Sequence, residues 1–201
     1  MWQAKGKGDG HVGRVPPVGG RSRIIARAGV AAGVAALLSG CGFTAGASRL
    51  TPDAPSSMTV SSAAFGQGVL PDRYTCHGAR TSPPLNWSGA PAGTKSYAIV
   101  VDDAAAPITP YIYWIVFDIP PATTDVQDGQ LPPGARQAHN STGRAGYTAP
   151  CPDGPGHGYR FTVYALRSML NLPNGASTVS AWSAIANTAI ARGRIPVRAN
   201  P

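Results

Sequence analysis

Tyr111–Ile119 (YIYWIVFDI) is the stretch that decides the fold class of this 201-residue chain. It consists almost entirely of β-branched and aromatic residues, and a proline lies on either side of it. A short apolar run bounded by chain-breaking residues is typical of a buried β-strand. Ser96–Val101 (SYAIVV) has the same character. We therefore expect a domain built mainly on β-structure.

Further elements are predicted on both sides of these two strands. Met58–Phe65 and Arg194–Ala199 have strand-like composition, and Tyr159–Arg167 alternates between two faces. The one convincing helix is Thr178–Arg192, which Gly193 would end. Its predicted buried face contains Val179, Trp182, Ile185, Ala186, Ala189 and Ile190. Several strands with one late helix predict an all-β or β-rich α+β domain.

Charge is distributed unevenly along the chain. The net charge is +8, but the first 40 residues hold six basic residues and one acidic residue, while residues 41–201 carry only +3. The excess therefore lies just before an apolar run, as it does in targeting sequences. The remainder contains one lysine, Lys95, and no clustered basic face is apparent, which argues against a nucleic-acid partner. No apolar run approaches the length of a membrane-spanning helix.

The N-terminal region has the layout of a bacterial lipoprotein signal. Arg21–Arg27 is basic, Ala28–Leu38 is apolar, and Leu38–Cys41 (LSGC) resembles a lipobox, in which small residues precede the cysteine that receives lipid. An ordinary signal peptide, or an alanine-rich core helix with a buried cysteine, is the alternative.

The lipobox divides the chain into three parts. Residues 1–40 are predicted to be a lipoprotein signal peptide, residues 41–57 a lipidated N-terminus and flexible tether, and residues 58–201 the folded domain. Acyl chains on Cys41 would anchor the domain to the extracytoplasmic face of the bacterial cell membrane.

Four regions of the mature chain resemble the motifs of one family. They are Tyr74–Gly78 (YTCHG) with Ser82–Trp87 (SPPLNW), Val101–Pro107 (VDDAAAP), Asn140–Tyr147 (NSTGRAGY) with Pro150–Pro152 (PCP), and Gly156–Phe161 (GHGYRF). Over about residues 58–199 the chain is similar to the phosphatidylethanolamine-binding proteins, specifically their bacterial Raf-kinase-inhibitor-like branch. The resemblance implies a large antiparallel sheet packed on a smaller sheet, with a C-terminal helix beside a small anion-binding pocket.

The resemblance also implies which side chains form that pocket. The family's pocket positions fall on Asp103, Tyr113, His157 and Tyr159, with Pro107 in the wall. A histidine N–H and a tyrosine O–H would face a phosphate or a phospholipid headgroup, and the aspartate would orient the imidazole.

The chain departs from the family pattern at four positions. Ala104 and Ala105 replace a proline and an aspartate of the DPDAP loop, Tyr113 replaces a histidine, and Gly158 replaces the arginine of the HRY motif. We expect weaker anion binding than in a complete family site, by about 1–3 kcal/mol per charged hydrogen bond lost.

Each pocket residue also has a purely structural interpretation. Asp103 could cap a turn after a strand, and His157 could be an exposed loop histidine. Tyr113 and Tyr159 could be core aromatics, as Trp114 is expected to be.

Two cysteines remain once Cys41 is assigned to lipid. Outside the cytoplasm such a pair most often forms a disulfide, and the family fold places the turns of Cys76 and Cys151 on the pocket side. The alternative is a metal site with His77 and His157, whose spacing is unusual for zinc.

The residues favour a binding module over an enzyme. The chain contains no glutamate and no Gly-x-Ser-x-Gly or His-Glu-x-x-His motif, so no cofactor, metal or catalytic residue is predicted. We expect a membrane-anchored protein that binds a small anion or headgroup. One alternative is an interaction or inhibitor module for a kinase, a protease or an envelope protein. Another is a weak hydrolase that uses His157 with Asp103.

Overall fold

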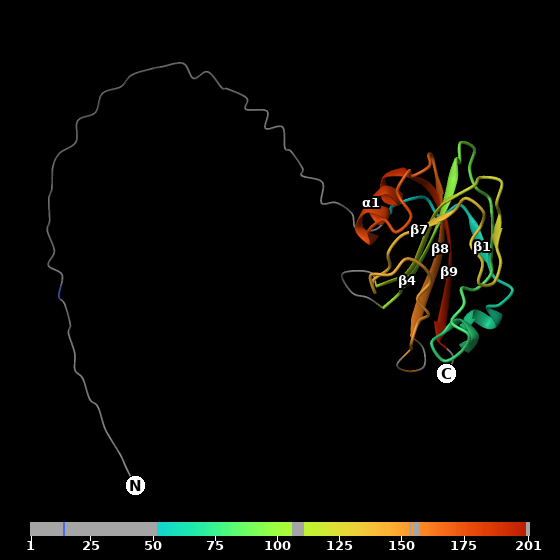
Figure 1. The fold of residues 1–201 in the computed structure, drawn as a ribbon, viewed down its shortest axis with the longest axis vertical. Helices are drawn as coiled ribbons and strands as arrows, with labels where there is room; N and C mark the ends of the chain where they lie inside the picture. The colour runs from blue at the N-terminus through green and yellow to red at the C-terminus, as the bar shows by residue number, and fades with distance from the viewer. Residues whose placement is uncertain (1–13, 15–51, 106–110, 153, 155–156, 200–201) are drawn as a thin grey trace, which may run out of the picture. The chain divides into compact units, whose positions relative to one another are not determined.

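The computed structural model describes residues 14, 52–105, 111–152, 154 and 157–199. In residues 45–201, the described strands form two sheets, and the described residues contain one α-helix, α1 (Thr178–Thr188) (Figure 1). The predicted β-rich α+β class, with a large sheet, a smaller sheet and a C-terminal helix, is confirmed.

Six strands form the large sheet, in the order β2-β9-β8-β4-β5-β7. Their bounds are β2 Val69–Leu70, β4 Ser96–Asp103, β5 Ile112–Ile119, β7 Arg136–Gln137, β8 Gly158–Leu166 and β9 Ala189–Ala199. Neighbouring strands are antiparallel except β2 and β9. The two apolar runs of the sequence become the adjacent strands β4 and β5, and β4 is buried along its whole length. Such a strand needs cover on both faces of its sheet.

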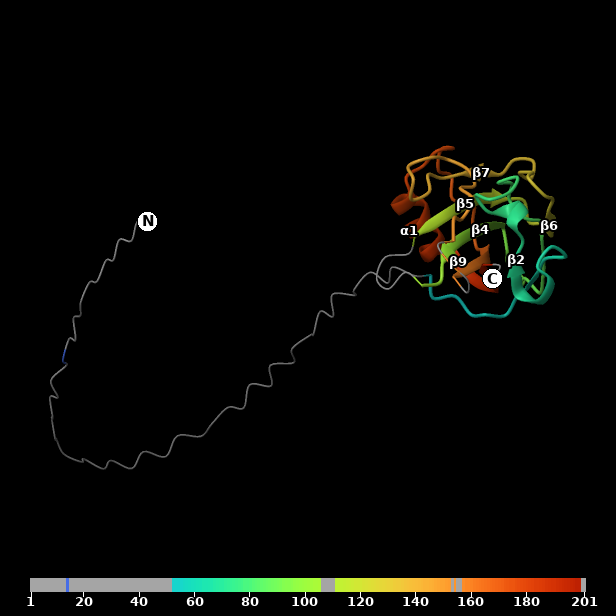
Figure 2. The ribbon, with the colours of Figure 1, turned by 90° about the horizontal axis from the view of Figure 1, so that it is seen from below.

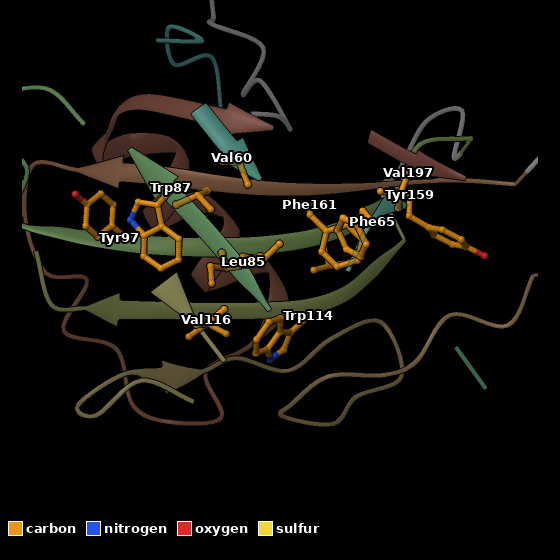
Figure 3. Packing of buried hydrophobic residues seen from close by; sticks show 14 of the residues in the cluster. Val60, Phe65, Leu85, Trp87, Tyr97, Trp114, Val116, Tyr159, Phe161 and Val197 are labelled. Atoms are coloured by element: carbon orange, nitrogen blue, oxygen red, sulfur yellow. The ribbon is translucent and has the colours of Figure 1, made fainter. Parts of the chain in front are cut away.

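The smaller sheet covers one of those faces. It has the order β1-β3-β6, with β1 Thr59–Ser61, β3 Leu85–Ser88 and β6 Asp125–Val126. Two 3₁₀ turns, η1 (Gly66–Gly68) and η2 (Asp72–Tyr74), lie between β1 and β3 in the chain. Leu85 and Trp87 are buried and alternate with exposed residues, so they pack against the large sheet (Figure 3). Figure 2 shows β6 and α1 on opposite sides of the large sheet.

The two faces of β8 contribute to separate hydrophobic clusters. Phe161 and Val163 pack in the cluster under the smaller sheet, whereas Tyr164 and Leu166 pack in the cluster under α1. Helix α1 begins at the Ser177 cap, whose side chain accepts a hydrogen bond from the Ser180 backbone N–H at 3.1 Å. The alternation predicted for this strand therefore sets the two layers of the core.

The helix is shorter than its predicted range. It ends at Thr188, and β9 begins at Ala189, where the backbone is extended. Ala191 then pairs with Ala165 of β8, so pairing along β8 satisfies the backbone groups of a segment with helical spacing. Val179, placed on the buried face by that spacing, is 75% exposed.

The domain begins before its predicted boundary at residue 58. Pro52 and Ala54 are buried, and Arg192 of β9 donates from its backbone N–H to the Pro55 carbonyl at 2.8 Å. A Cβ on Gly193 would lie 2.7 Å from the Met58 carbonyl oxygen, so glycine permits this close approach. Residues 52–57, predicted as part of the tether, therefore pack along β9, because backbone hydrogen bonds fix them there.

The signal peptide, Cys41 and residues 41–51 of the tether lie outside the described residues. Within the part of the chain that is described, no helix has the length and apolar character needed to cross a membrane.

Candidate functional site

The end of β4 brings Asp103 and His157 together. Asp103 is the last residue of β4, and His157 immediately precedes β8, the antiparallel neighbour of β4. The carboxylate Oδ2 of Asp103 lies 2.8 Å from Nε2 of His157. Its Oδ1 accepts the backbone N–H of Ala105 at 2.8 Å. The carboxylate thus holds the imidazole by one ring nitrogen, and Nδ1 is the nitrogen left for another partner.

Three tyrosines stand beside this pair. Tyr159 lies opposite Asp103 in the β4–β8 register, and its ring centroid is 5.1 Å from that of His157. Tyr113 meets Tyr159 edge-on at 5.5 Å, and Tyr111 lies 4.9 Å from Tyr113. We call these five residues the His–Tyr cluster. The structure therefore brings together all four predicted pocket residues that it describes.

The His–Tyr cluster is partly open to solvent. Tyr159 is buried and Tyr113 half-buried, while the His157 side chain is 34% exposed and Tyr111 is 41% exposed. Figure 3 shows Tyr159 at the end of the core cluster, with its hydroxyl directed away from the other labelled side chains. A small polar group reaching the exposed side would meet an imidazole and aromatic rings.

Burial determines what Tyr113 can offer there. It raises the pKa of Tyr113, and the nearby Tyr159 and Asp103 raise that pKa further. The hydroxyl therefore stays protonated and neutral at physiological pH. Tyr113 can donate a hydrogen bond to an anion but adds no positive charge, unlike the histidine that it replaces in the family pattern.

Two of the departures from the family pattern lie against each other. Gly158 accepts the Ala104 N–H at 2.9 Å through its carbonyl. A Cβ on residue 158 would lie 3.2 Å from the Ala104 Cβ, closer than ordinary van der Waals contact. A larger residue at 158 would therefore require the chain at Ala104 to move. The arrangement of the chain at Ala104 thus depends on glycine at position 158.

Two residues at this end of the sheet are absent from the predicted pocket. Tyr111 was not singled out, although alternation along the strand places it on the same face as Tyr113. Arg160 was also missed; its Nε donates to Oδ2 of the buried Asp102 at 3.0 Å, and its Nη2 contacts that carboxylate and the carbonyl of Asp103. Burial raises the pKa of Asp102, and Arg160 offsets part of the rise.

Of two other motif residues, the structure describes Asn140 but not Pro107. Pro107, predicted to line the pocket, lies outside the described residues. Asn140 is 2% exposed, and its Nδ2 donates to the Gly146 carbonyl at 2.9 Å and to Thr148 Oγ1 at 2.8 Å. Asn140 therefore holds the 140–148 loop together, and its Nδ2 also lies 3.5 Å from the backbone carbonyl of Tyr113, which ties this loop to β5.

Cys76 and Cys151 form a disulfide in the structure. Their Cα atoms are 5.1 Å apart, and the Cys76 N–H donates to the Pro150 carbonyl at 2.9 Å. Tyr147 adds a second link between the same loops, donating its hydroxyl to the Tyr74 carbonyl at 2.8 Å. Because both sulfurs are bonded to each other, the alternative metal site built on these cysteines is contradicted.

Comparisons with known proteins agree with this architecture. The family described as "Phosphatidylethanolamine-binding protein" matches residues 60–199. The chain is 42% identical over 189 residues to "Putative lipoprotein LppC" of Mycobacterium tuberculosis, covering 85% of this chain and 92% of that protein. It is 42% identical over 126 residues to a UPF0098 protein of Methanothermobacter thermautotrophicus, covering 60% of this chain and 83% of that protein.

A solved structure shares the fold. The crystal structure of E. coli YbcL, described as a new member of the mammalian PEBP family, superposes with a TM-score of 0.66 at 30% identity. The match covers 73% of this chain and 99% of that one. Because the family match spans residues 60–199 and a member of the family shares the fold, this chain is a member of the phosphatidylethanolamine-binding protein family.

Proposed function

We propose that this protein is a membrane-anchored lipoprotein whose domain binds a small anion, either a phosphate or a phospholipid headgroup, without catalysis. The observation that carries the proposal is the His157–Asp103 contact of 2.8 Å beside the tyrosines. A carboxylate that accepts from Nε2 directs Nδ1 elsewhere, and an Nδ1–H on a protonated ring would donate to an anion. The family's printed description as phosphatidylethanolamine-binding supports the headgroup as one source of that anion.

The first test removes the imidazole. His157→Ala is expected to weaken phosphate and phosphoethanolamine binding at least about tenfold, because a hydrogen bond to a charged group contributes about 1.5–3 kcal/mol. Chemical-shift titration of the two ligands measures this, and it also separates free phosphate from a headgroup. His139→Ala is the matched control, since His139 is an exposed histidine outside the cluster. Equal affinity of the His157 variant and wild type would refute the anion site.

The same variant tests the alternatives. A partner protein that co-purifies equally with wild type and His157→Ala would favour an interaction or inhibitor module. Ester turnover that the substitution abolishes would favour a hydrolase.

A second prediction concerns the lipid anchor. The name of the M. tuberculosis relative supports a lipoprotein, and the LSGC sequence ending at Cys41 supports the site. Wild-type protein made in its bacterial host is expected to incorporate a labelled fatty acid and to enter the detergent phase. Cys41→Ser is expected to lose the label and shift to the aqueous phase. Label retained in that variant would exclude Cys41 as the lipidated residue.

A further inference from the structure

The face of β9 that is turned away from the smaller sheet carries a row of arginines. Arg192, Arg194 and Arg198 alternate with residues whose side chains face the core, and Arg194 and Arg198 are exposed. Arg160 of β8 lies between the last two, because it pairs with Pro196 of β9. We call these four residues the β9 arginine row. Cross-strand pairing therefore gathers on one face of the sheet arginines that are spread along the sequence.

The row runs along β9 from Arg192 to Arg198 and keeps part of its positive charge. Arg198 lies six residues after Arg192 along the extended strand, which is a distance of about 20 Å. Arg160 is neutralised by Asp102, and Arg194 donates to the neutral Thr162 hydroxyl at 2.9 Å. Among the described residues, neither Arg194 nor Arg198 has an ion pair with a carboxylate. Within the part of the chain that the structure describes, these two guanidinium groups therefore have no direct carboxylate partner, although Arg194 also lies within the electrostatic reach of Asp102.

The N-terminal segment enters the domain at one end of this row. Arg192 Nη1 donates to the Pro52 carbonyl at 3.0 Å, and its Nε contacts Ser56 Oγ at 3.2 Å. Asp53 lies in the same segment and places one negative charge at this end. Pro52 lies eleven residues after Cys41, so a lipid on Cys41 would hold Pro52 within about 40 Å of the membrane surface.

We propose that the β9 arginine row rests on the anionic phospholipid headgroups of the membrane to which the chain is anchored. Guanidinium groups bind phosphates through paired hydrogen bonds, and an extended row can meet several headgroups at once. A soluble polyanion would meet the same charges, but the chain enters beside Arg192, which favours the bilayer as the occupant. The orientation rests on the proposed anchor, whereas the attraction between the row and anionic lipid does not.

The experiment measures vesicle binding without the anchor. Full-length Cys41→Ser protein is mixed with vesicles of phosphatidylcholine alone, or of equal parts phosphatidylcholine and phosphatidylglycerol, and sedimented. Binding to the anionic vesicles is expected to be stronger and to decline with added salt. Adding Arg194→Gln and Arg198→Gln is expected to weaken it roughly thirtyfold, at about fivefold per arginine near the surface.

Matched variants separate the position of the charges from their number. Lys95→Gln with Arg144→Gln removes two exposed charges elsewhere and is expected to bind nearly as wild type does. Arg194→Lys with Arg198→Lys keeps the charge and should retain most of the binding, with thermal melting as the check on folding. Equal loss in both glutamine pairs, or no loss in either, would overturn the proposal. Preferential binding of soluble polyphosphate at equal phosphate concentration would overturn the bilayer as the occupant. Because every protein here lacks Cys41, failure of the lipidation prediction cannot produce these outcomes.

Discussion

Arg160→Met is expected to lower the free energy of unfolding by about 3 kcal/mol at neutral pH, since removing one partner strands a buried charge. The Asp102 side chain is only 3% exposed, and Arg160 is the cation that contacts it. The estimate is at the low end for a buried pair because the Arg160 side chain is 25% exposed. Urea denaturation followed by circular dichroism measures the change.

Two controls identify the stranded carboxylate as the cause. Asp102→Leu combined with Arg160→Met removes both charges and is expected to recover most of the lost stability. Burial already raises the pKa of Asp102 in the wild type, so the folded state binds a proton more readily than the unfolded chain does. Loss of Arg160 raises this pKa further, so the deficit of the single variant is fully present above the variant's Asp102 pKa and shrinks as the pH falls and Asp102 becomes protonated. A deficit that is constant with pH and persists in the double variant would indicate lost packing instead.

Replacing Cys76 and Cys151 with serine is expected to cost about 4 kcal/mol of stability. The disulfide closes a loop with a sequence separation of 75 residues, and its main effect in the chain-entropy model is to restrict the unfolded state. Urea denaturation of the double serine variant measures the loss. A lower value would indicate that the Tyr147–Tyr74 hydrogen bond and neighbouring backbone contacts hold the loops without the bond.

Reduction supplies the control for this prediction. A reductant is expected to destabilise wild type by the same amount as the serine substitutions and to leave the double serine variant unchanged. Wild-type stability that is insensitive to the reductant, with two free thiols found by mass spectrometry, would contradict the disulfide.

The two central strands could be predicted from the local sequence pattern, because their apolar composition and their surroundings in the fold both favour a buried strand. Ser96–Val101 and Tyr111–Ile119 are apolar on both faces, and β4 and β5 are covered on both faces. The end of the helix could not be predicted in this way. Ala189 and Ile190 continue the helical spacing, yet hydrogen bonding to β8 draws them into β9. Tertiary pairing outweighs a weak local preference there.

The candidate site was predictable only in part. The resemblance pointed to Asp103, Tyr113, His157 and Tyr159, and the structure places these four side chains together. The β9 arginine row could not be predicted from the sequence, because strand register and not sequence spacing places Arg160 beside β9. The contact of Arg192 with Pro52 joins positions 140 residues apart, a separation at which no local pattern is informative.

The late position of β9 in the chain bears on how this protein is made. This strand lies between β2 and β8, and its Arg192 holds the incoming segment at Pro55 and Met58. A polypeptide growing from its N-terminus cannot complete the large sheet until residues 189–199 have been synthesised, because β9 lies between β2 and β8. Truncation within β9 would leave one edge of β8 without hydrogen-bonding partners and therefore prone to aggregation.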